Sequence, residues 1–134
     1  MDRVHAFDPE GTDFTFDDLF SFNGIVPQYN WSCLGEHDIL APARTQVKAY
    51  PYEKDHNFGP YGLSFADDRW DLRHAVKIRF TPTNADHPYK FKDIYIDINS
   101  MEPMYSFAYD RKGELWKIIW HAKIWSDNPD NAAY

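Results

Sequence analysis

The sequence predicts a mainly β (α+β) fold with a four-stranded antiparallel meander at residues 70–125 and a short helix near residues 16–22. Two observations carry this prediction. Apolar and polar side chains alternate with a period of two residues through the second half of the chain, which is the pattern of half-buried strands. Aromatic residues make up 18% of the chain, and their wide side chains favour pleated sheet and the walls of cavities.

The length of 134 residues is that of one domain, so we expect residues 1–134 to form a single unit. The net charge of −7 comes without a concentrated basic stripe, which argues against a nucleic-acid partner. The single cysteine, Cys33, cannot form an internal disulfide, and we expect it to be a small buried side chain. The charged residues near the start are not those of a signal peptide, and no apolar run has the length of a membrane span.

A short helix is predicted after a polar, turn-like start. Thr15 is placed to cap it, Asp17 and Asp18 lie in the first turn, where the helix dipole favours negative charge, and Gly24 stands where a left-handed residue would end it. A helix of about two turns does not hold together alone in water, so it must dock on other parts of the chain. We expect it to dock through an apolar stripe made of Phe16, Leu19 and Phe20, to which Phe22 can add.

Two further segments lie between this helix and the meander. Residues 29–41 have an extended pattern, with Gly35 at a bulge or bend. Residues 42–69 contain several Pro and Gly and no sustained period. Such a stretch is typical of a lid or a binding loop, and a solvated loop without a function is an equally good interpretation.

The strands of the predicted meander follow residues 70–80, 93–98, 104–110 and 114–125. Residues 110–113 form a tight hairpin in which Gly113 takes a position that needs a positive φ. One face of the meander is predicted to collect these large apolar side chains: Leu72, Val76, Ile78, Phe80, Ile94, Ile96, Ile98, Trp116, Ile118, Trp120 and Ile124.

The meander does not account for its own stability. Burying its apolar face contributes on the order of 15–30 kcal/mol, whereas ordering about sixty residues costs more, at roughly 1.5 kcal/mol each. Other parts of the chain, a partner or a ligand must therefore cover this face. Leu115, Ile119 and Trp125 project from the opposite side, and a sheet that is apolar on both sides is usually sandwiched or curved around a cavity.

The ionisable residues do not identify a reaction. The six histidines lack the spacing of metal ligands, and we predict neither a metal nor another cofactor. His74 is expected to be a hydrogen-bonded core residue, and a pairing with His121 across neighbouring strands is the less favoured alternative. Asp93 and Asp97 share a face with Tyr95, which fits an acid–base pair in a cleft, but a solvated strand face explains them better. No nucleophile elbow, phosphate-binding loop or CxxC is present in the sequence.

The aromatic and isoleucine side chains are more informative about function. Together they can line a pocket for an acyl chain or a polycyclic ligand. The predicted ligand-binding residues are Trp31, Ile94, Ile96, Trp116, Ile118 and Trp120. The alternative interpretation is that the same side chains pack against a helix.

Several strings of residues, in order along the chain, resemble a known family. They are Phe22-Asn23-Gly24, Tyr29-Asn30-Trp31 with Leu34-Gly35, Arg69-Trp70-Asp71-Leu72, Tyr95-Ile96-Asp97 and Tyr109-Asp110-Arg111-Lys112-Gly113-Glu114-Leu115-Trp116-Lys117. They resemble the C-terminal part of a proteobacterial envelope family known as domain of unknown function 1329, described as similar to outer-membrane lipoprotein-sorting proteins. Residues 32–43 depart from the family, in which the corresponding segment is basic.

The resemblance implies a fold related to the periplasmic lipoprotein carriers, in which a strongly curved antiparallel sheet is an incomplete barrel and helices plug its apolar concave side. It implies a periplasmic or outer-membrane location, and that the chain is the C-terminal portion of a longer carrier-like domain. The family has no established catalytic residues.

These observations lead to three hypotheses about function. We expect first a non-enzymatic binding domain whose partner is a lipid or another hydrophobic small molecule. The second hypothesis is a structural or interaction module whose apolar face is covered by another envelope protein or a second copy of the chain. A small hydrolase that uses His74 or His121 is the third and least favoured.

Overall fold

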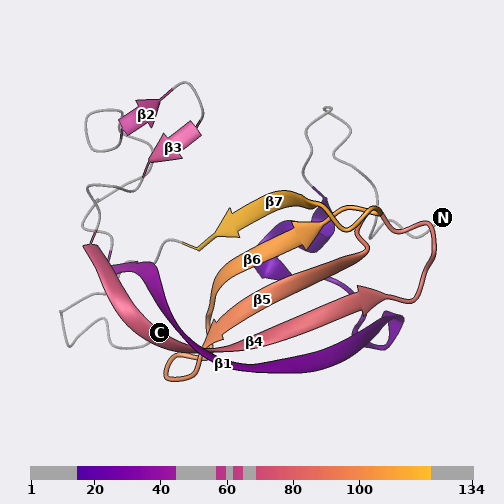
Figure 1. The fold of residues 1–134 in the computed structure, drawn as a ribbon, viewed down its shortest axis with the longest axis horizontal. Helices are drawn as coiled ribbons and strands as arrows, with labels where there is room; N and C mark the ends of the chain where they lie inside the picture. The colour runs from indigo at the N-terminus through magenta and orange to yellow at the C-terminus, as the bar shows by residue number, and fades with distance from the viewer. Residues whose placement is uncertain (1–14, 45–56, 60–61, 65–68, 122–134) are drawn as a thin grey trace. The chain divides into compact units, whose positions relative to one another are not determined.

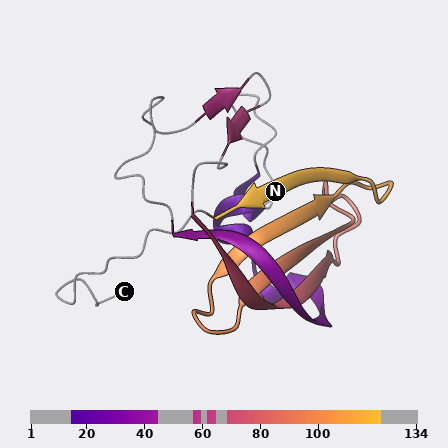
Figure 2. The same ribbon diagram turned by 60° about the vertical axis from the view of Figure 1, so that its left-hand side comes forward.

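A computed structural model of the chain describes residues 15–44, 57–59, 62–64 and 69–121. Its main feature is an open five-stranded antiparallel sheet in the order β1-β4-β5-β6-β7 (Figure 1). The strands are β1 (Tyr29–Arg44), β4 (Arg69–Pro82), β5 (Phe91–Asp97), β6 (Pro103–Tyr109) and β7 (Leu115–Trp120). The 3-10 helices η2 (Phe16–Ser21) and η3 (Val26–Gln28) precede β1. The predicted mainly β fold with a curved, open antiparallel sheet is confirmed (Figure 2).

The remaining described strands form a sheet of their own. β2 (Asn57–Gly59) and β3 (Gly62–Ser64) pair as a short antiparallel hairpin within residues 42–69, where the sequence has no sustained period. The chain divides into two compact units, one of residues 1–39 with 74–121 and one of residues 40–73 with 122–134. The last predicted strand ends at Trp120, and residues 122–125 lie outside the described ranges. Among the described residues, no helix is long and apolar enough to cross a membrane.

The strand register decides which side chains share a face, because residues opposite each other in an antiparallel pair point to the same side. On the face that contacts η2, which we call the helix face, Phe80 pairs with Lys92, Lys92 with Ala108 and Ala108 with Lys117. On the other, outer face, Asp93 pairs with Phe107.

The side of η2 that is buried is the opposite of the predicted one. Thr15, Asp18 and Ser21 are buried, whereas Leu19 is 36% and Phe20 80% exposed. A 3-10 helix has three residues per turn, so Thr15 and Asp18, which are three apart, share one side. Leu19 and Phe20 have non-helical backbone angles, and the buried Ser21 follows this kink. The predicted apolar stripe is therefore wrong for Leu19 and Phe20, because the helix docks through its polar side.

The end of η2 also differs from the prediction. The left-handed residues are Phe20, with φ of 52°, and Ser21, with φ of 68°, and not Gly24. A side chain at Gly24 is excluded for another reason, because an added Cβ would lie 2.8 Å from the ring of Tyr29. Gly24 thus allows a close approach between the loop after η2 and the first residue of β1.

The hydrophobic core lies on the helix face. Its buried members are Tyr29, Phe80 and Ile94, with Phe22 and Ile96 packed against them. The rings of Phe22, Tyr29 and Phe80 meet edge to face with centroids 5.0 to 5.2 Å apart, a geometry that places ring edges against the negative ring faces. This cluster connects β1, β4 and β5.

Two glycines take the irregular positions that the sequence indicates. Gly35 in β1 has φ of +98°, and Gly113 in the β6–β7 turn has φ of +89°. In that turn the Asp110 carboxylate accepts hydrogen bonds from the backbone N–H groups of Lys112 and Glu114. Cys33 is exposed, and its predicted burial is wrong because it lies in residues 30–38 of the edge strand β1, all of which are exposed.

Candidate functional site

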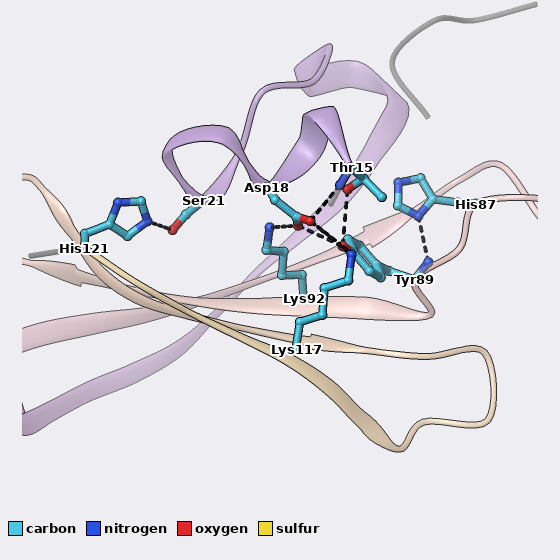
Figure 3. Close-up of polar contacts among 8 residues, drawn as sticks. All are labelled: Thr15, Asp18, Ser21, His87, Tyr89, Lys92, Lys117 and His121. Carbon is cyan, nitrogen blue, oxygen red and sulfur yellow. Dashed lines mark hydrogen bonds and ion pairs between the residues drawn. The ribbon is translucent and has the colours of Figure 1, made fainter. Parts of the chain in front are cut away.

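A buried carboxylate lies between η2 and the sheet (Figure 3). Lys92 Nζ donates to Asp18 Oδ1 at 2.9 Å, and Lys117 Nζ donates to Oδ2 at 3.2 Å. The Tyr89 hydroxyl donates to the same carboxylate and lies 2.8 Å from each oxygen. The backbone N–H of Thr15 donates to Oδ2 at 3.0 Å. We call Asp18, Tyr89, Lys92 and Lys117 the carboxylate cluster.

The cluster keeps Asp18 ionised. Burial by itself would raise the pKa of this carboxyl group, but the charge of Lys92 and the hydrogen bonds from Lys92, Thr15 and Tyr89 together lower the pKa below its ordinary value. Hydrogen bonds to the charged form and a nearby opposite charge favour the carboxylate. A charged group of η2 is therefore one of its attachments to the sheet.

Aromatic rings surround both ammonium groups of the cluster. The fully buried Lys92 has its Nζ 5.6 Å from the ring centroid of Tyr89 and 6.0 Å from that of Phe80. Lys117 Nζ lies 4.3 Å from the ring of Trp116 and 5.1 Å from that of Tyr89. The negative ring faces attract each cation, so the site favours two positive charges on a largely apolar face of the sheet.

A buried hydroxyl group lies close to this cluster on the same face. Ser106 in β6 pairs with Ile94 and Ile119, two residues from Ala108, which pairs with both lysines of the cluster. The Ser106 Oγ has no hydrogen-bond partner among the described residues. Burying an unsatisfied hydroxyl costs about 1–3 kcal/mol.

Part of the helix face away from the cluster is apolar and partly open. Val76 pairs with Ile96 and Ile78 with Ile94, and Val76, Ile78 and Ile96 are all partly exposed. Trp31 of β1 is 39% exposed and lies 5.4 Å from Phe80 between ring centroids. We call Trp31, Val76, Ile78 and Ile96 the open apolar surface.

The structure places the predicted ligand-binding residues in three different environments. Trp31 and Ile96 belong to the open apolar surface, whereas Ile94 is buried in the core. Trp116 lies at the irregularity in the β6–β7 register and contacts the ring of Tyr89 with centroids 5.6 Å apart. Ile118 and Trp120 lie on the outer face, opposite Phe107 and Tyr105.

The predicted placement of Ile118 and Trp120 beside the isoleucines of β5 is therefore wrong. Lys117 and Ile119 of β7 occupy the helix face instead. The physical reason is that Lys117 pairs with the buried Asp18, so a charged residue of β7 faces inward and its apolar neighbours face outward. The ligand-binding role of the six residues stays a prediction.

The outer face carries a second buried carboxylate. Asp93 is 1% exposed and receives hydrogen bonds from Arg79 Nε at 2.6 Å and Nη2 at 2.9 Å, with Lys77 Nζ 3.0 Å away. Burial would raise the pKa of Asp93, but hydrogen bonds from Arg79 and Lys77 lower it. Asp97 is buried as well and accepts hydrogen bonds from the N–H and hydroxyl groups of Ser100. The predicted solvated face for these two acids is wrong.

Aromatic side chains form a stripe across the outer face. Phe91 stacks on Tyr109 with centroids 4.4 Å apart, and Tyr95 meets Phe107 at 5.6 Å. Trp120 continues the stripe at the β7 edge. Cross-strand aromatic pairs of this kind stabilise a sheet.

The histidines take positions other than those expected. His74 is exposed, and its Nδ1 and Nε2 lie 2.7 Å from Asp38 and 2.8 Å from Glu36. These two hydrogen bonds raise the pKa of His74. The predicted core position of His74 is wrong. The alternative pairing of His74 with His121 required these residues to lie on neighbouring strands. It is also wrong, because β5 and β6 separate β4 from β7.

His121 instead contacts Ser21 at the end of η2. The distance from Ser21 Oγ to His121 Nε2 is 2.7 Å, and Ser21 is buried. A serine next to a histidine is one part of a nucleophilic site, but such a site also needs access for a substrate carbonyl group. Among the described residues, no group of three His, Cys, Asp or Glu side chains is arranged to hold a metal ion.

A family model described as "Protein of unknown function (DUF1329)" matches residues 4–132. The chain belongs to this family. The match covers nearly the whole DUF1329 chain, including η2, the five-stranded sheet and both lysines of the carboxylate cluster. A comparison with curated protein sequences finds no match.

The fold of this DUF1329 chain also resembles a solved structure. It is a domain from Vibrio parahaemolyticus that is provisionally named an outer membrane lipoprotein-sorting protein domain, with 16% sequence identity and a TM-score of 0.56. The likeness covers 96% of the DUF1329 chain and 40% of the solved chain. The DUF1329 chain therefore spans less than half the length of this neighbour, and the two share a fold.

Sequence reasoning missed the carboxylate cluster of the DUF1329 chain. It assigned Asp18 to the first turn of a helix, where the helix dipole favours negative charge, and gave Lys117 no role. The spacing of Thr15 and Asp18 was a usable signal, because polar residues three apart share one side of a 3-10 helix. No sequence signal identified the partners Tyr89 and Lys92, which come from a different part of the chain.

Proposed function

We propose that this chain is a non-enzymatic binding domain of the cell envelope that carries a lipid or another hydrophobic molecule on the helix face of its sheet. The observation that carries the proposal is the open apolar surface, where Trp31, Val76, Ile78 and Ile96 remain partly exposed beside a well-packed core. Contiguous exposed apolar surface is costly in water and is typical of a binding site. The name of the solved neighbour, a lipoprotein-sorting domain, supports an envelope location and a carrier role.

The ligand test compares charged substitutions on the two faces. Val76→Glu places a carboxylate on the open apolar surface, and Ile118→Glu places one on the outer face, where Ile118 is 49% exposed. We expect native mass spectrometry and lipid extraction to find a hydrophobic molecule on the wild type and on Ile118→Glu, and none on Val76→Glu. Wild-type protein without any bound or bindable hydrophobic molecule would contradict the proposal.

The non-enzymatic part of the proposal is tested separately. Ser21, the serine that contacts His121, is 1% exposed, so a substrate does not reach its oxygen in this conformation. We expect a serine-reactive fluorophosphonate probe to leave the folded protein unlabelled. Stoichiometric labelling of Ser21, lost in Ser21→Ala, would support a hydrolase instead.

A second candidate function, an interaction module, is favoured by the aromatic stripe of the outer face. Ile118 and Trp120 are 49% and 40% exposed there, on the edge strand β7. If a second copy covers this face, light scattering will show a concentration-dependent dimer that Ile118→Glu abolishes and Val76→Glu retains. The two substitutions therefore separate the candidate functions by opposite outcomes.

A further inference from the structure

We propose that Tyr89, Lys92 and Lys117 form a binding site for the anionic headgroup of the hydrophobic ligand, and that the Asp18 carboxylate occupies this site in the present structure. The inference rests on the proposed function and specifies its ligand class. The ligand is an amphiphile with an acyl chain and a phosphate or carboxylate headgroup.

The two lysine donors belong to strands of the sheet, whereas the carboxylate they bind does not. Lys92 lies in β5 and Lys117 in β7, and their Nζ atoms approach the two oxygens of one carboxylate at 2.9 and 3.2 Å. The Tyr89 hydroxyl adds a third donor at 2.8 Å. Convergent charged donors are the usual means by which proteins bind phosphate and carboxylate groups. Asp18 reaches this site from η2, outside the sheet (Figure 3).

The buried hydroxyl of Ser106 also supports an additional anionic ligand at this site. It lies on the same face as Lys92 and Lys117, and its Oγ has no hydrogen-bond partner among the described residues. Buried hydroxyl groups are ordinarily hydrogen-bonded. A phosphate headgroup has more acceptor oxygens than the Asp18 carboxylate, so it has acceptors to offer this hydroxyl in addition to the lysines.

The site and the open apolar surface lie on the same face of the sheet, with the buried Ile94 between them on β5. Lys92, Ile94 and Ile96 follow one another on the helix face of β5. At about 3.3 Å per residue the span from Lys92 to Ile96 is roughly 13 Å. To contact Val76 and Ile96, an acyl chain attached to a headgroup at Lys92 must therefore extend past the buried Ile94.

η2 contributes little stability of its own to the contact at Asp18. It has six residues and includes the left-handed residues Phe20 and Ser21, whose backbone conformation is unfavourable for L-residues. A helix of this length gains little stability from its own hydrogen bonds. Its attachment at Asp18 therefore depends on the contacts that an anionic headgroup would replace.

The test measures binding of three probes to the full chain by isothermal titration calorimetry. The probes are dodecyl phosphate, the uncharged monododecanoylglycerol and inorganic phosphate. We expect dodecyl phosphate to bind about tenfold more tightly than the uncharged probe, because charge-assisted hydrogen bonds add to the apolar contact. Inorganic phosphate should bind much more weakly than dodecyl phosphate. Equal affinities for free phosphate and dodecyl phosphate would overturn the assignment to an amphiphile.

Two substitutions test the roles of individual residues. Lys117→Met should lower the affinity for dodecyl phosphate about tenfold and leave that for the uncharged probe unchanged, with the exposed Lys112→Met as the matched control. Asp18→Asn should raise the affinity for dodecyl phosphate, because a neutral amide competes less well for the two lysines. If Lys117→Met does not fold, as judged by circular dichroism, Asp18→Asn alone tests the headgroup site. An unchanged or lower affinity of Asp18→Asn for dodecyl phosphate overturns the proposal.

The outcomes distinguish this inference from the proposed function. If neither dodecyl phosphate nor monododecanoylglycerol binds, the proposed function is contradicted, and the headgroup site is contradicted with it. If the charged and uncharged probes bind equally and Lys117→Met affects neither, the hydrophobic site stands and only the headgroup site is overturned.

Discussion

At the scale of single residues, β5 is unusual because consecutive charged residues are buried on opposite faces. Lys92 faces η2 and pairs with Asp18, whereas Asp93 faces outward and pairs with Arg79 and Lys77. Removing one member of a buried pair leaves the other charge without compensation. The charge pairs therefore favour one register of β5 in the sheet, because a shift by one residue would separate both pairs.

Asp93→Asn should destabilise the protein by about 1–3 kcal/mol, because it removes the charge that Arg79 and Lys77 share in a buried position. Urea unfolding followed by circular dichroism measures this change. Asp86→Asn, at an exposed position, is the matched control and should stay within about 0.5 kcal/mol of the wild type. An equal effect of the two substitutions would show that the Asp93 contacts do not matter for stability.

Phe20→Asn should stabilise the protein by roughly 0.5–1 kcal/mol, because asparagine tolerates left-handed backbone better than phenylalanine does. Phe20 has φ of 52° and is 80% exposed, so little packing is lost. Thermal unfolding measures the change. Leu19→Asn is the control, since Leu19 has an ordinary φ of −59° and should gain nothing. A lower midpoint for Phe20→Asn would mean that the Phe20 side chain makes a stabilising contact.

At the scale of elements, His74 of β4 is linked to β1 by hydrogen bonds to Glu36 and Asp38. These bonds raise the pKa of His74 in the folded state above its unfolded value of 6.5. A group with a raised folded pKa contributes stability that is complete below the unfolded pKa and is lost as pH rises through the folded pKa. The link between β1 and β4 is therefore strongest in mildly acidic solution.

The wild type should thus lose stability relative to His74→Gln as the pH rises from about 6 through the folded pKa of His74. The difference in unfolding free energy between the two proteins, measured in urea at several pH values, should shrink with increasing pH. His37→Gln, at a neighbouring exposed position in β1, is the control. A pH-independent difference for His74→Gln would contradict a charged link between the strands.

The strands could be predicted from the sequence, but the faces of some of them could not. Alternation along residues 70–80 and the turn at Asp110 and Gly113 identified the meander, because both signals are local. The faces of β7 were misassigned because they depend on Lys117 meeting Asp18, 99 residues away. The same contact reversed the buried side of η2. Local patterns predict elements well, whereas a buried charge pair between distant segments overrides the rule that apolar residues face inward.

At the scale of the whole molecule, Asp18 and Asp93 make stability depend on acidity. The pKa of each carboxyl group is lowered in the folded state, although burial alone would raise it. Such a group contributes stability that is present above its unfolded pKa and is lost as pH falls through the folded pKa. The net contribution of both carboxylates is therefore present at neutral pH and absent in strong acid.

Unfolding free energy should accordingly fall as the pH decreases below about 4. In Asp18→Asn with Asp93→Asn this decrease should be smaller, and the double variant should be less stable than the wild type at neutral pH. Urea titrations across the acidic range test the expectation. The same acid dependence in the wild type and in the double variant would mean that other carboxyl groups determine it.

The polar inner side of η2 also bears on the order of folding. Hydrophobic collapse can assemble Tyr29, Phe80 and Ile94, but it gives no guidance to the exposed Leu19 and Phe20 of η2. η2 therefore docks late, after β5 and β7 have brought Lys92 and Lys117 together, and its amide protons should exchange with solvent faster than those of the central strands. Nucleation would then belong to the sheet, and η2 would join through a final electrostatic step that added salt slows or weakens.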